Sequence, residues 1–190
     1  MSSRPSPFLE KGPTARLFDA LRFAAEKHRD GRRKGEIAAP YINHPITVAE
    51  QLAAAGLEHD TDLLIAALLH DVVEDTDTSS EDLRRRFGER VAEIVLELTD
   101  DKRLDWRERK RRVVESIGTK SREAQLIKLS DLIANVSDLI HHPPNWQIER
   151  KRGYLLWAEL VVETMRGVQP ELEGRFAELM REARRGVGAG

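Results

Sequence analysis

Four residues of types that commonly bind metal ions stand at unusual places in this sequence: His44, His70, Asp71 and Asp131. His70 and Asp71 end the apolar run "LLIAALL", and Asp131 interrupts the apolar segment "KLSDLIAN". Carboxylates in such surroundings need pairing or coordination. Two imidazoles and two carboxylates form a suitable set for one divalent ion, and mixed nitrogen and oxygen ligands favour Mn, Fe, Co or Zn over Ca. We therefore predict a buried metal site.

Each of these residues also has an ordinary structural interpretation. His44, just before a proline, could cap a helix, and Asp131 could pair with Lys128, one turn earlier. The adjacent His70 and Asp71 could be a cap or surface feature. The occurrence of all four, two of them within apolar helical segments, favours coordination over four separate explanations.

A second pair of carboxylates, Glu74 and Asp75, follows one helical turn later. If the helix continues, Glu74 lies on the side of His70, and Asp75 lies on the side of Asp71. They would then stand beside the ion without binding it, where metal-assisted hydrolysis needs a general acid or base. The alternative is a solvated acidic helix end, although acidic residues there oppose the helix dipole.

Polar and basic residues near these positions are candidates for contacts with a ligand. Asn135, one turn after Asp131, could hydrogen-bond a sugar hydroxyl or a carboxylate, or be a satisfied core amide. Arg33 and Lys34, in the loop "GRRKGE", could bind phosphate or stack on a base, or they could simply be solvated. The basic run 107–112 is interpreted as a solvated helix face.

The composition indicates a charged, helix-rich protein. Charged residues make up 34% of the 190 residues and aromatic residues only 5%, which favours helix over sheet. A net charge of -2 gives no overall field to attract nucleic acid or an anionic membrane. There is no cysteine, no run near the roughly 20 apolar residues of a membrane span, and no apolar stretch of a signal peptide. We expect a cytoplasmic location.

Helical spacing and capping residues divide the chain into the elements that must position these side chains. Thr14 and Asp60 are expected to cap helices, and Thr78 with Glu81 has the spacing of a capping box. The run 63–69 is apolar all round and predicts a central helix that continues through the acidic pair. Further helices are expected over residues 45–55, 91–98, 105–117, 122–140, 146–167 and 171–185. No alternating pattern supports a strand, so the sequence predicts an all-α bundle.

Taken together, the motifs resemble a known family. The order His, His-Asp, Asp resembles the HD superfamily of metal-dependent phosphohydrolases. The strings "RRKGEIAAPYINHP", "ALLHDVVEDTD", "TDDK" and "KLSDLIANVSDL" are similar to the hydrolase domain of RelA/SpoT-type proteins, and in particular to small alarmone hydrolases. The resemblance implies an all-α HD-domain bundle of about eight to ten helices with a buried metal site. We expect a flexible arm over 1–13, the hydrolase domain over 14–185 and a frayed end over 186–190.

The resemblance also implies roles for individual residues. The matched Mn²⁺ ligands are His44, His70, Asp71 and Asp131, with another divalent transition metal as an alternative. The matched catalytic pair is Glu74 and Asp75. The matched substrate-binding residues are Arg33, Lys34, Asn135, Arg150 and Tyr154. The implied reaction removes pyrophosphate from the 3′ position of (p)ppGpp and gives GDP or GTP.

The chain also departs from the family pattern. Leu132 stands where a cationic residue is usual, Ala134 stands where an aromatic residue or histidine is usual, and residues 36–39 lengthen the base-binding loop. These departures leave other substrates open, namely pppApp-type alarmones or the 2′-phosphate of NADPH. A non-catalytic nucleotide sensor and a plain helical interaction module are the remaining alternatives. The expected partner is a small-molecule nucleotide, with no nucleic acid and no membrane, and a homodimer is left open.

Overall fold

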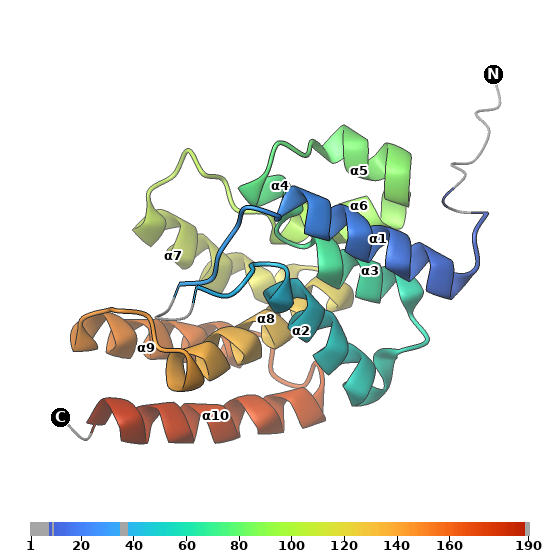
Figure 1. Cartoon of the computed structure of the whole chain (residues 1–190). Helices are drawn as coiled ribbons and strands as arrows, with labels where there is room; N and C mark the ends of the chain where they lie inside the picture. Colours follow the sequence, from blue (N-terminus) through green and yellow to red (C-terminus); the bar gives the residue numbers. More distant parts are fainter. Residues whose placement is uncertain (1–7, 9, 35–37, 189–190) are drawn as a thin grey trace.

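In the computed structural model, which describes residues 8, 10–34 and 38–188, every regular element within those ranges is a helix (Figure 1). The α-helices are α1 (Pro13–Lys27), α2 (Asn43–Leu52), α3 (Thr61–Leu69), α4 (Val72–Asp75), α5 (Ser80–Phe87), α6 (Glu89–Leu98), α7 (Trp106–Ser116), α8 (Arg122–His141), α9 (Ile148–Thr164) and α10 (Pro170–Gly188). A π-helical turn, η1 (Ala53–Leu57), follows α2, and a 3₁₀ turn, η2 (Ile117–Thr119), follows α7. None of the described helices is both long enough and apolar enough to cross a membrane. The predicted all-α bundle of about eight to ten helices is confirmed.

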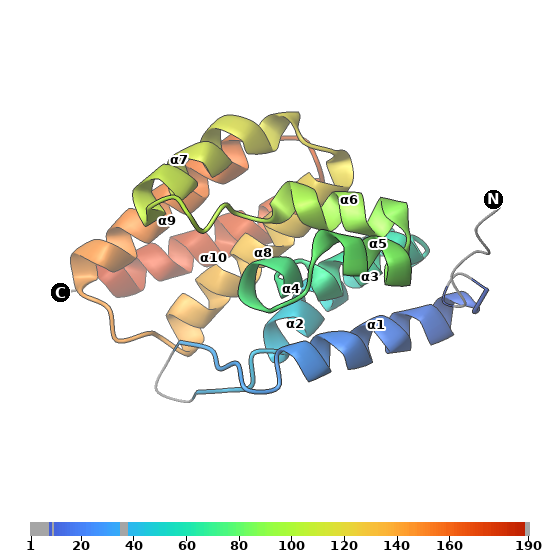
Figure 2. The same ribbon diagram turned by 90° about the horizontal axis from the view of Figure 1, so that it is seen from above.

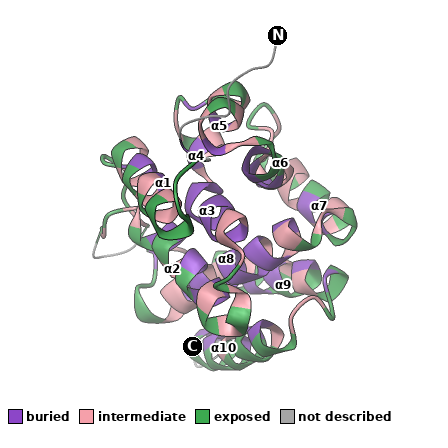
Figure 3. Ribbon diagram, turned by 90° about the vertical axis from the view of Figure 1, so that its right-hand side faces the viewer, coloured by how far each residue is buried: buried purple, intermediate pink, exposed green. Residues whose placement is uncertain are grey.

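Helices α3 and α8 form the centre of the bundle. Every side chain from Leu63 to Leu69 in α3 is buried, as is every side chain from Leu129 to Ala134 in α8. Helix α3 contacts α1, α2 and α6, and α8 contacts α2, α6, α9 and α10. Figure 2 shows the outer helices around this pair, and Figure 3 shows that buried residues concentrate on α3 and α8. The candidate ligands that follow α3, His70 and Asp71, and the candidate ligand within α8, Asp131, are therefore held by the buried centre of the bundle.

The first residues of α3 and α5 follow from local capping chemistry. The Asp60 side chain accepts a hydrogen bond from the backbone N–H of Leu63, as a predicted cap should, and α3 begins at Thr61. The capping box before α5 is formed by Ser79 and Asp82. The prediction of Thr78 with Glu81 is wrong by one residue, because the Thr78 hydroxyl is buried and bonds to another threonine.

The N-terminal region begins its helix earlier than predicted. Helix α1 starts at Pro13 and has no side-chain cap, so the prediction of Thr14 as the cap is wrong. Proline suits this position because the first helical N–H groups have no partner within the helix. Phe8, within the predicted arm 1–13, is buried, and its ring meets that of Phe87 edge-on at a centroid distance of 5.0 Å. The arm's residues 1–7 and 9 lie outside the described residues.

The predicted continuous helix through the apolar run is interrupted at His70 and Asp71. Helix α3 ends just before them, and Asp71 is the N-cap of the short helix α4. A backbone hydrogen bond of 2.8 Å from the Asp75 N–H to the Asp71 carbonyl closes the single turn of α4. At the other end of the chain, α10 continues to Gly188, into the segment 186–190 that is predicted to be frayed, and the last two residues lie outside the described part.

Candidate metal centre and catalytic cleft

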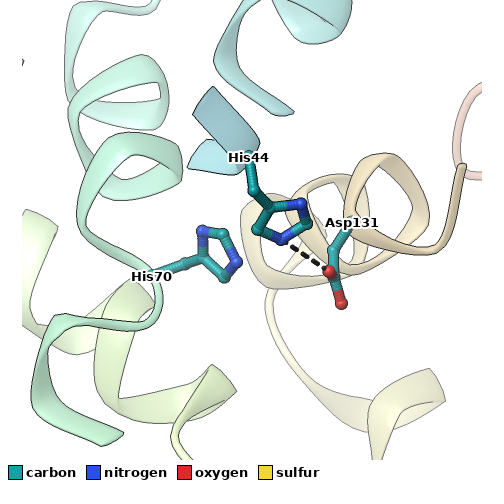
Figure 4. Close-up of side chains that lie close together, drawn as sticks. All are labelled: His44, His70 and Asp131. Atoms are coloured by element: carbon teal, nitrogen blue, oxygen red, sulfur yellow. Dashed lines mark ion pairs between the residues drawn. The ribbon is translucent and has the colours of Figure 1, made fainter. Parts of the chain in front are cut away.

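Three buried side chains from separate segments point toward one another in the interior: His44 at the start of α2, His70 after α3 and Asp131 in α8 (Figure 4). Their candidate ligand atoms all lie within 4.8 Å of one another. His44 Nε2 is 3.1 Å from Asp131 Oδ1. Asp71 Oδ2 lies 3.0 Å from His70 Nε2 and 3.9 Å from His44 Nε2. The structure therefore brings the four predicted ligands together.

The orientation of His70 fits a metal ligand. Its Nδ1 lies 2.7 Å from the Ala67 carbonyl oxygen and donates to it, which leaves the lone pair on Nε2. The Nε2 atom is buried and makes no hydrogen bond, although it is close to Asp71. A cation bound between Nε2 and the nearby Asp71 oxygen would give both atoms a partner. These nitrogen and oxygen donors fit a divalent transition metal.

Asp131 is shared between a histidine and a lysine. Lys128 Nζ lies 3.0 Å from Asp131 Oδ2, so the expected alternative pairing does form, while Oδ1 faces His44. Burial alone would raise the pKa of Asp131, but the Lys128 ammonium and the His44 ring hold it well below its usual value. Both oxygens of this carboxylate are therefore charged acceptors at neutral pH.

In the neighbouring His70–Asp71 pair, burial and the charge of the partner also shift the pKa values in opposite directions. Burial would raise the pKa of the Asp71 carboxyl, but the His70 ring holds it below its usual range. Burial opposes protonation of His70, yet the Asp71 carboxylate prevails and raises the pKa of His70 to about 9. Without a cation, a proton on His70 balances the negative charge of the site, and a bound metal would replace that proton.

Glu74 and Asp75 line a cleft next to these four residues. Glu74 Oε2 accepts a hydrogen bond of 3.2 Å from the Asp100 backbone N–H, and Oε1 is 3.5 Å from Arg109 Nη1. Burial raises the pKa of Glu74, while the bond from Asp100 acts in the opposite direction. Asp75 Oδ1 pairs with Lys102 Nζ at 2.7 Å. The "TDDK" segment therefore contacts both carboxylates, through the Asp100 N–H and the Lys102 ammonium.

The cleft has a volume of about 770 Å³, which is enough for a nucleotide. It is lined by six of the residues predicted to act in catalysis or substrate binding: Arg33, Lys34, Glu74, Asp75, Asn135 and Tyr154. Further cations among its lining residues are Lys27, Arg32, Lys102 and Arg109, which suit a phosphorylated ligand. Arg150 is not among the lining residues; its guanidinium lies 4.3 Å from the ring centroid of Trp146, which does line the cleft.

Two cleft residues connect it to the buried ligands. Tyr41 donates its hydroxyl hydrogen bond to Asp71 Oδ2, and Asn135 Nδ2 donates to Asp131 Oδ1 at 2.6 Å. Burial raises the pKa of Tyr41, so its hydroxyl stays a donor. Of the alternatives expected for Asn135, the carboxylate contact is the one present. Tyr41 is not predicted from the sequence; its place three residues before His44, in "PYINHP", is the available signal.

The basic run 107–112 divides between solvent and the interior. Arg111 and Arg112 are exposed, as the solvated-face interpretation requires. That interpretation is wrong for Arg109, which lines the cleft, and for Lys110, whose Nζ lies 3.5 Å from the Trp157 ring centroid. The packing of α7 against α9 turns this side of the helix inward.

Two of the three departures from the family pattern are buried residues of the core. Leu132 and Ala134 are both buried in α8, so neither presents a charge to the cleft. In the lengthened loop, Ala39 accepts a backbone hydrogen bond of 2.9 Å from Arg33, and residues 36–37 lie outside the described part. In α8 the candidate ligand Asp131 therefore matches the family pattern, while its neighbours Leu132 and Ala134 are apolar.

Comparisons with known proteins agree with this site. The HD domain family model matches residues 20–151, more than half of the chain. Guanosine-3′,5′-bis(diphosphate) 3′-pyrophosphohydrolase MESH1 of Drosophila melanogaster is 44% identical over 171 residues, which are 90% of this chain and 96% of that protein. The Homo sapiens protein of the same name is 43% identical over 169 residues, which are 88% of this chain and 94% of that protein.

A solved structure has the same architecture. It belongs to a metazoan ortholog of SpoT that is described as hydrolysing ppGpp and acting in starvation responses. It matches with a TM-score of 0.86 and 41% identity, over 98% of this chain and 99% of that one. The sequence matches, the shared fold and the buried histidines and aspartates lead to one conclusion: this chain belongs to the HD domain family, in the group that contains the MESH1 proteins.

Proposed function

We propose that this protein is a metal-dependent phosphohydrolase that removes pyrophosphate from the 3′ position of (p)ppGpp and releases GDP or GTP. The observation that carries the proposal is the buried cluster of His44, His70, Asp71 and Asp131 beside a cation-lined cleft of nucleotide size. The names of the relatives, which this chain matches over nearly its whole length, support the same reaction.

We assign the ion to the four clustered side chains and expect Mn²⁺. The mixed set of imidazole and carboxylate donors also suits Fe, Co or Zn, so the choice of Mn²⁺ is the part that needs measurement. When bound, such an ion polarises a phosphoryl oxygen and lowers the pKa of water toward about 7.

The chain's own residues account for the proton transfers. Hydrolysis joins a water oxygen to phosphorus and breaks the bond between that phosphorus and the 3′ oxygen. In our assignment Asp75, held by Lys102, accepts the proton of the attacking water. Glu74, whose pKa burial raises, donates a proton to the departing 3′ oxygen. The Asp100 N–H fixes the orientation of Glu74 for that donation.

We assign substrate binding to the cleft residues. We assign Arg33 and Lys34 to the base and the 5′ phosphates, and Tyr154 and Asn135 to the ribose. All four residues line the cleft, which supports these roles. Arg150 is assigned an indirect role, because it stacks on the cleft residue Trp146. Burial raises the pKa of Tyr154, so its hydroxyl stays neutral and can donate.

The test is product analysis after the purified protein is incubated with Mn²⁺ and ppGpp, pppApp or NADPH in parallel. We expect GDP and pyrophosphate from ppGpp with the highest kcat/KM, and no turnover after chelation with EDTA. Preference for pppApp or NADPH would replace the substrate assignment. Nucleotide binding without product would support a sensor, and neither binding nor turnover would refute the proposal. The cytoplasmic location and the absence of nucleic-acid or membrane partners stay predictions, and a homodimer stays open.

A further inference from the structure

Asp138 lies on the same face of α8 as the site residues Asp131 and Asn135, at spacings of seven and three residues. Its Oδ2 accepts hydrogen bonds from Arg33 Nε at 2.9 Å and from Arg33 Nη2 at 2.7 Å. The same Nη2 donates to Asn135 Oδ1 at 2.7 Å. The side chains of Arg33 and Asp138 are 17% and 35% exposed, so this contact lies in the cleft wall and not on the open surface.

These bonds use three of the five N–H donors of the Arg33 guanidinium: the Nε–H and both Nη2 hydrogens. The guanidinium also lies over the Tyr41 ring, 5.7 Å from its centroid. Tyr41 in turn bonds to Asp71, and Asn135 bonds to Asp131. The plane of Arg33 is therefore fixed relative to two of the candidate metal ligands.

These hydrogen bonds limit the ways in which the Arg33 side chain can bind a ligand. An arginine that binds phosphate does so through its N–H edge and its net positive charge. Here most of that edge is occupied and the Asp138 carboxylate compensates the charge. Stacking needs only one flat face, and the hydrogen bonds lie in the guanidinium plane and hold it in one orientation. Because Tyr41 lies over one face, a base would stack on the opposite face. Lys34, an exposed cation that also lines the cleft, is available for phosphates.

We propose that Asp138 is a positioning residue that holds Arg33 as a flat stacking surface for the nucleobase, which rests on the proposed nucleotide hydrolase function. Asp138 thereby contributes to binding of the base without contributing to binding of the phosphates. The competing interpretation is that the pair only fastens the loop of Arg33 to α8, in which case its loss would affect every ligand and the stability alike.

The test compares Asp138→Asn with a matched control, Glu123→Gln. Glu123 is on the same helix, pairs with Arg90 and has a similar exposed fraction of 31%. For each protein with Mn²⁺ we would measure the Kd of GDP and of pyrophosphate by calorimetry, the kcat and KM for ppGpp, and the Tm. Asp138→Asn should raise the Kd of GDP and the KM of ppGpp about tenfold, as expected for a lost charge-assisted hydrogen bond. The Kd of pyrophosphate and the kcat should stay within about threefold, and Glu123→Gln should change none of these values.

Double substitution shows whether Asp138 acts through Arg33. Arg33→Ala should raise the Kd of GDP at least as much as Asp138→Asn, and adding Asp138→Asn to Arg33→Ala should have no further effect. Additive effects, equal weakening of GDP and pyrophosphate, or an unchanged KM would overturn the inference while ppGpp turnover by the wild type stands. If the wild type neither binds GDP nor hydrolyses ppGpp, the proposed function fails and takes the inference with it.

Discussion

Replacement of Asp131 by asparagine separates two roles of this side chain, as a candidate metal ligand beside His44 and as the partner of Lys128. Oδ1 lies 3.1 Å from His44 Nε2, and Oδ2 lies 3.0 Å from Lys128 Nζ. Asparagine keeps the shape and removes the charge. Loss of an outer partner of a metal ligand alone lowers metal affinity about 10–100-fold, so loss of the ligand charge should lower Mn²⁺ affinity at least about 100-fold. Hydrolysis of ppGpp should fall with it.

The same substitution leaves the Lys128 ammonium without its carboxylate. The side chains of Lys128 and Asp131 are 17% and 11% exposed, so solvent screens the pair only weakly. Removal of one partner from a buried pair costs about 3–5 kcal/mol, and the partial exposure of this pair places the cost near about 3 kcal/mol. For a chain of this length the Tm falls by about 2–4 °C per kcal/mol, so the metal-free variant should melt about 6–12 °C lower.

A second variant distinguishes the lost ligand from the stranded lysine. In Lys128→Met/Asp131→Asn the unpaired ammonium is gone, so the Tm of the metal-free protein should recover to within about 3 °C of the wild type. Mn²⁺ binding, measured by calorimetric titration, should stay lost. Wild-type Mn²⁺ affinity and full hydrolysis in Asp131→Asn would refute the assignment of the ligand. A Tm that does not recover in the double variant would refute the account of Lys128.

Four further outcomes follow from the contacts of the site and of the central helix. Glu74→Gln should lower the kcat for ppGpp about 10²–10⁴-fold with little change in KM, and an unchanged kcat would exclude Glu74 as the proton donor. Tyr41→Phe removes the hydroxyl bonded to Asp71 and should lower Mn²⁺ affinity about 10–100-fold in a calorimetric titration; equal affinity would contradict that role. Because the metal-free pKa of His70 is about 9, the imidazole is protonated at neutral pH and must release its proton. The apparent Kd of Mn²⁺ should therefore rise about tenfold for each unit that pH falls from 8 to 6, whereas a Kd independent of pH would show that no proton is displaced. Asp60→Ala removes the cap of α3 and should destabilise the protein by about 0.5–2 kcal/mol in denaturant unfolding, with ppGpp hydrolysis retained.

The central helices and the metal ligands could be predicted from the sequence because each has a local signature. The run 63–69 is apolar on every side, and the structure buries all of it. His70 and Asp131 are conspicuous because polar groups in apolar segments need a partner. Asp60 caps its helix through its own side chain. In each of these cases the physical cause lies within a few residues of the effect.

Features that depend on contacts between distant segments were not predictable in the same way. The break at His70 leaves no mark in an apolar pattern that suits a continuous helix. Whether Arg109 faces solvent or the cleft depends on which side of α7 packs against α9, and a single sequence does not specify that packing. Asp138 lies on the same helical face as Asp131 and Asn135, but its partner Arg33 is 105 residues away along the chain. Spacing can place residues on one face, while the fold decides what that face meets.

The most direct test of the central claim is a crystal structure of the Mn²⁺-soaked protein with diffraction data collected on both sides of the manganese absorption edge. One anomalous peak should appear in the interior, within about 2.5 Å of ligand atoms from His44, His70, Asp71 and Asp131. A peak elsewhere, or an interior with no peak in a protein that hydrolyses ppGpp with Mn²⁺, would contradict the claim that these four residues share one ion.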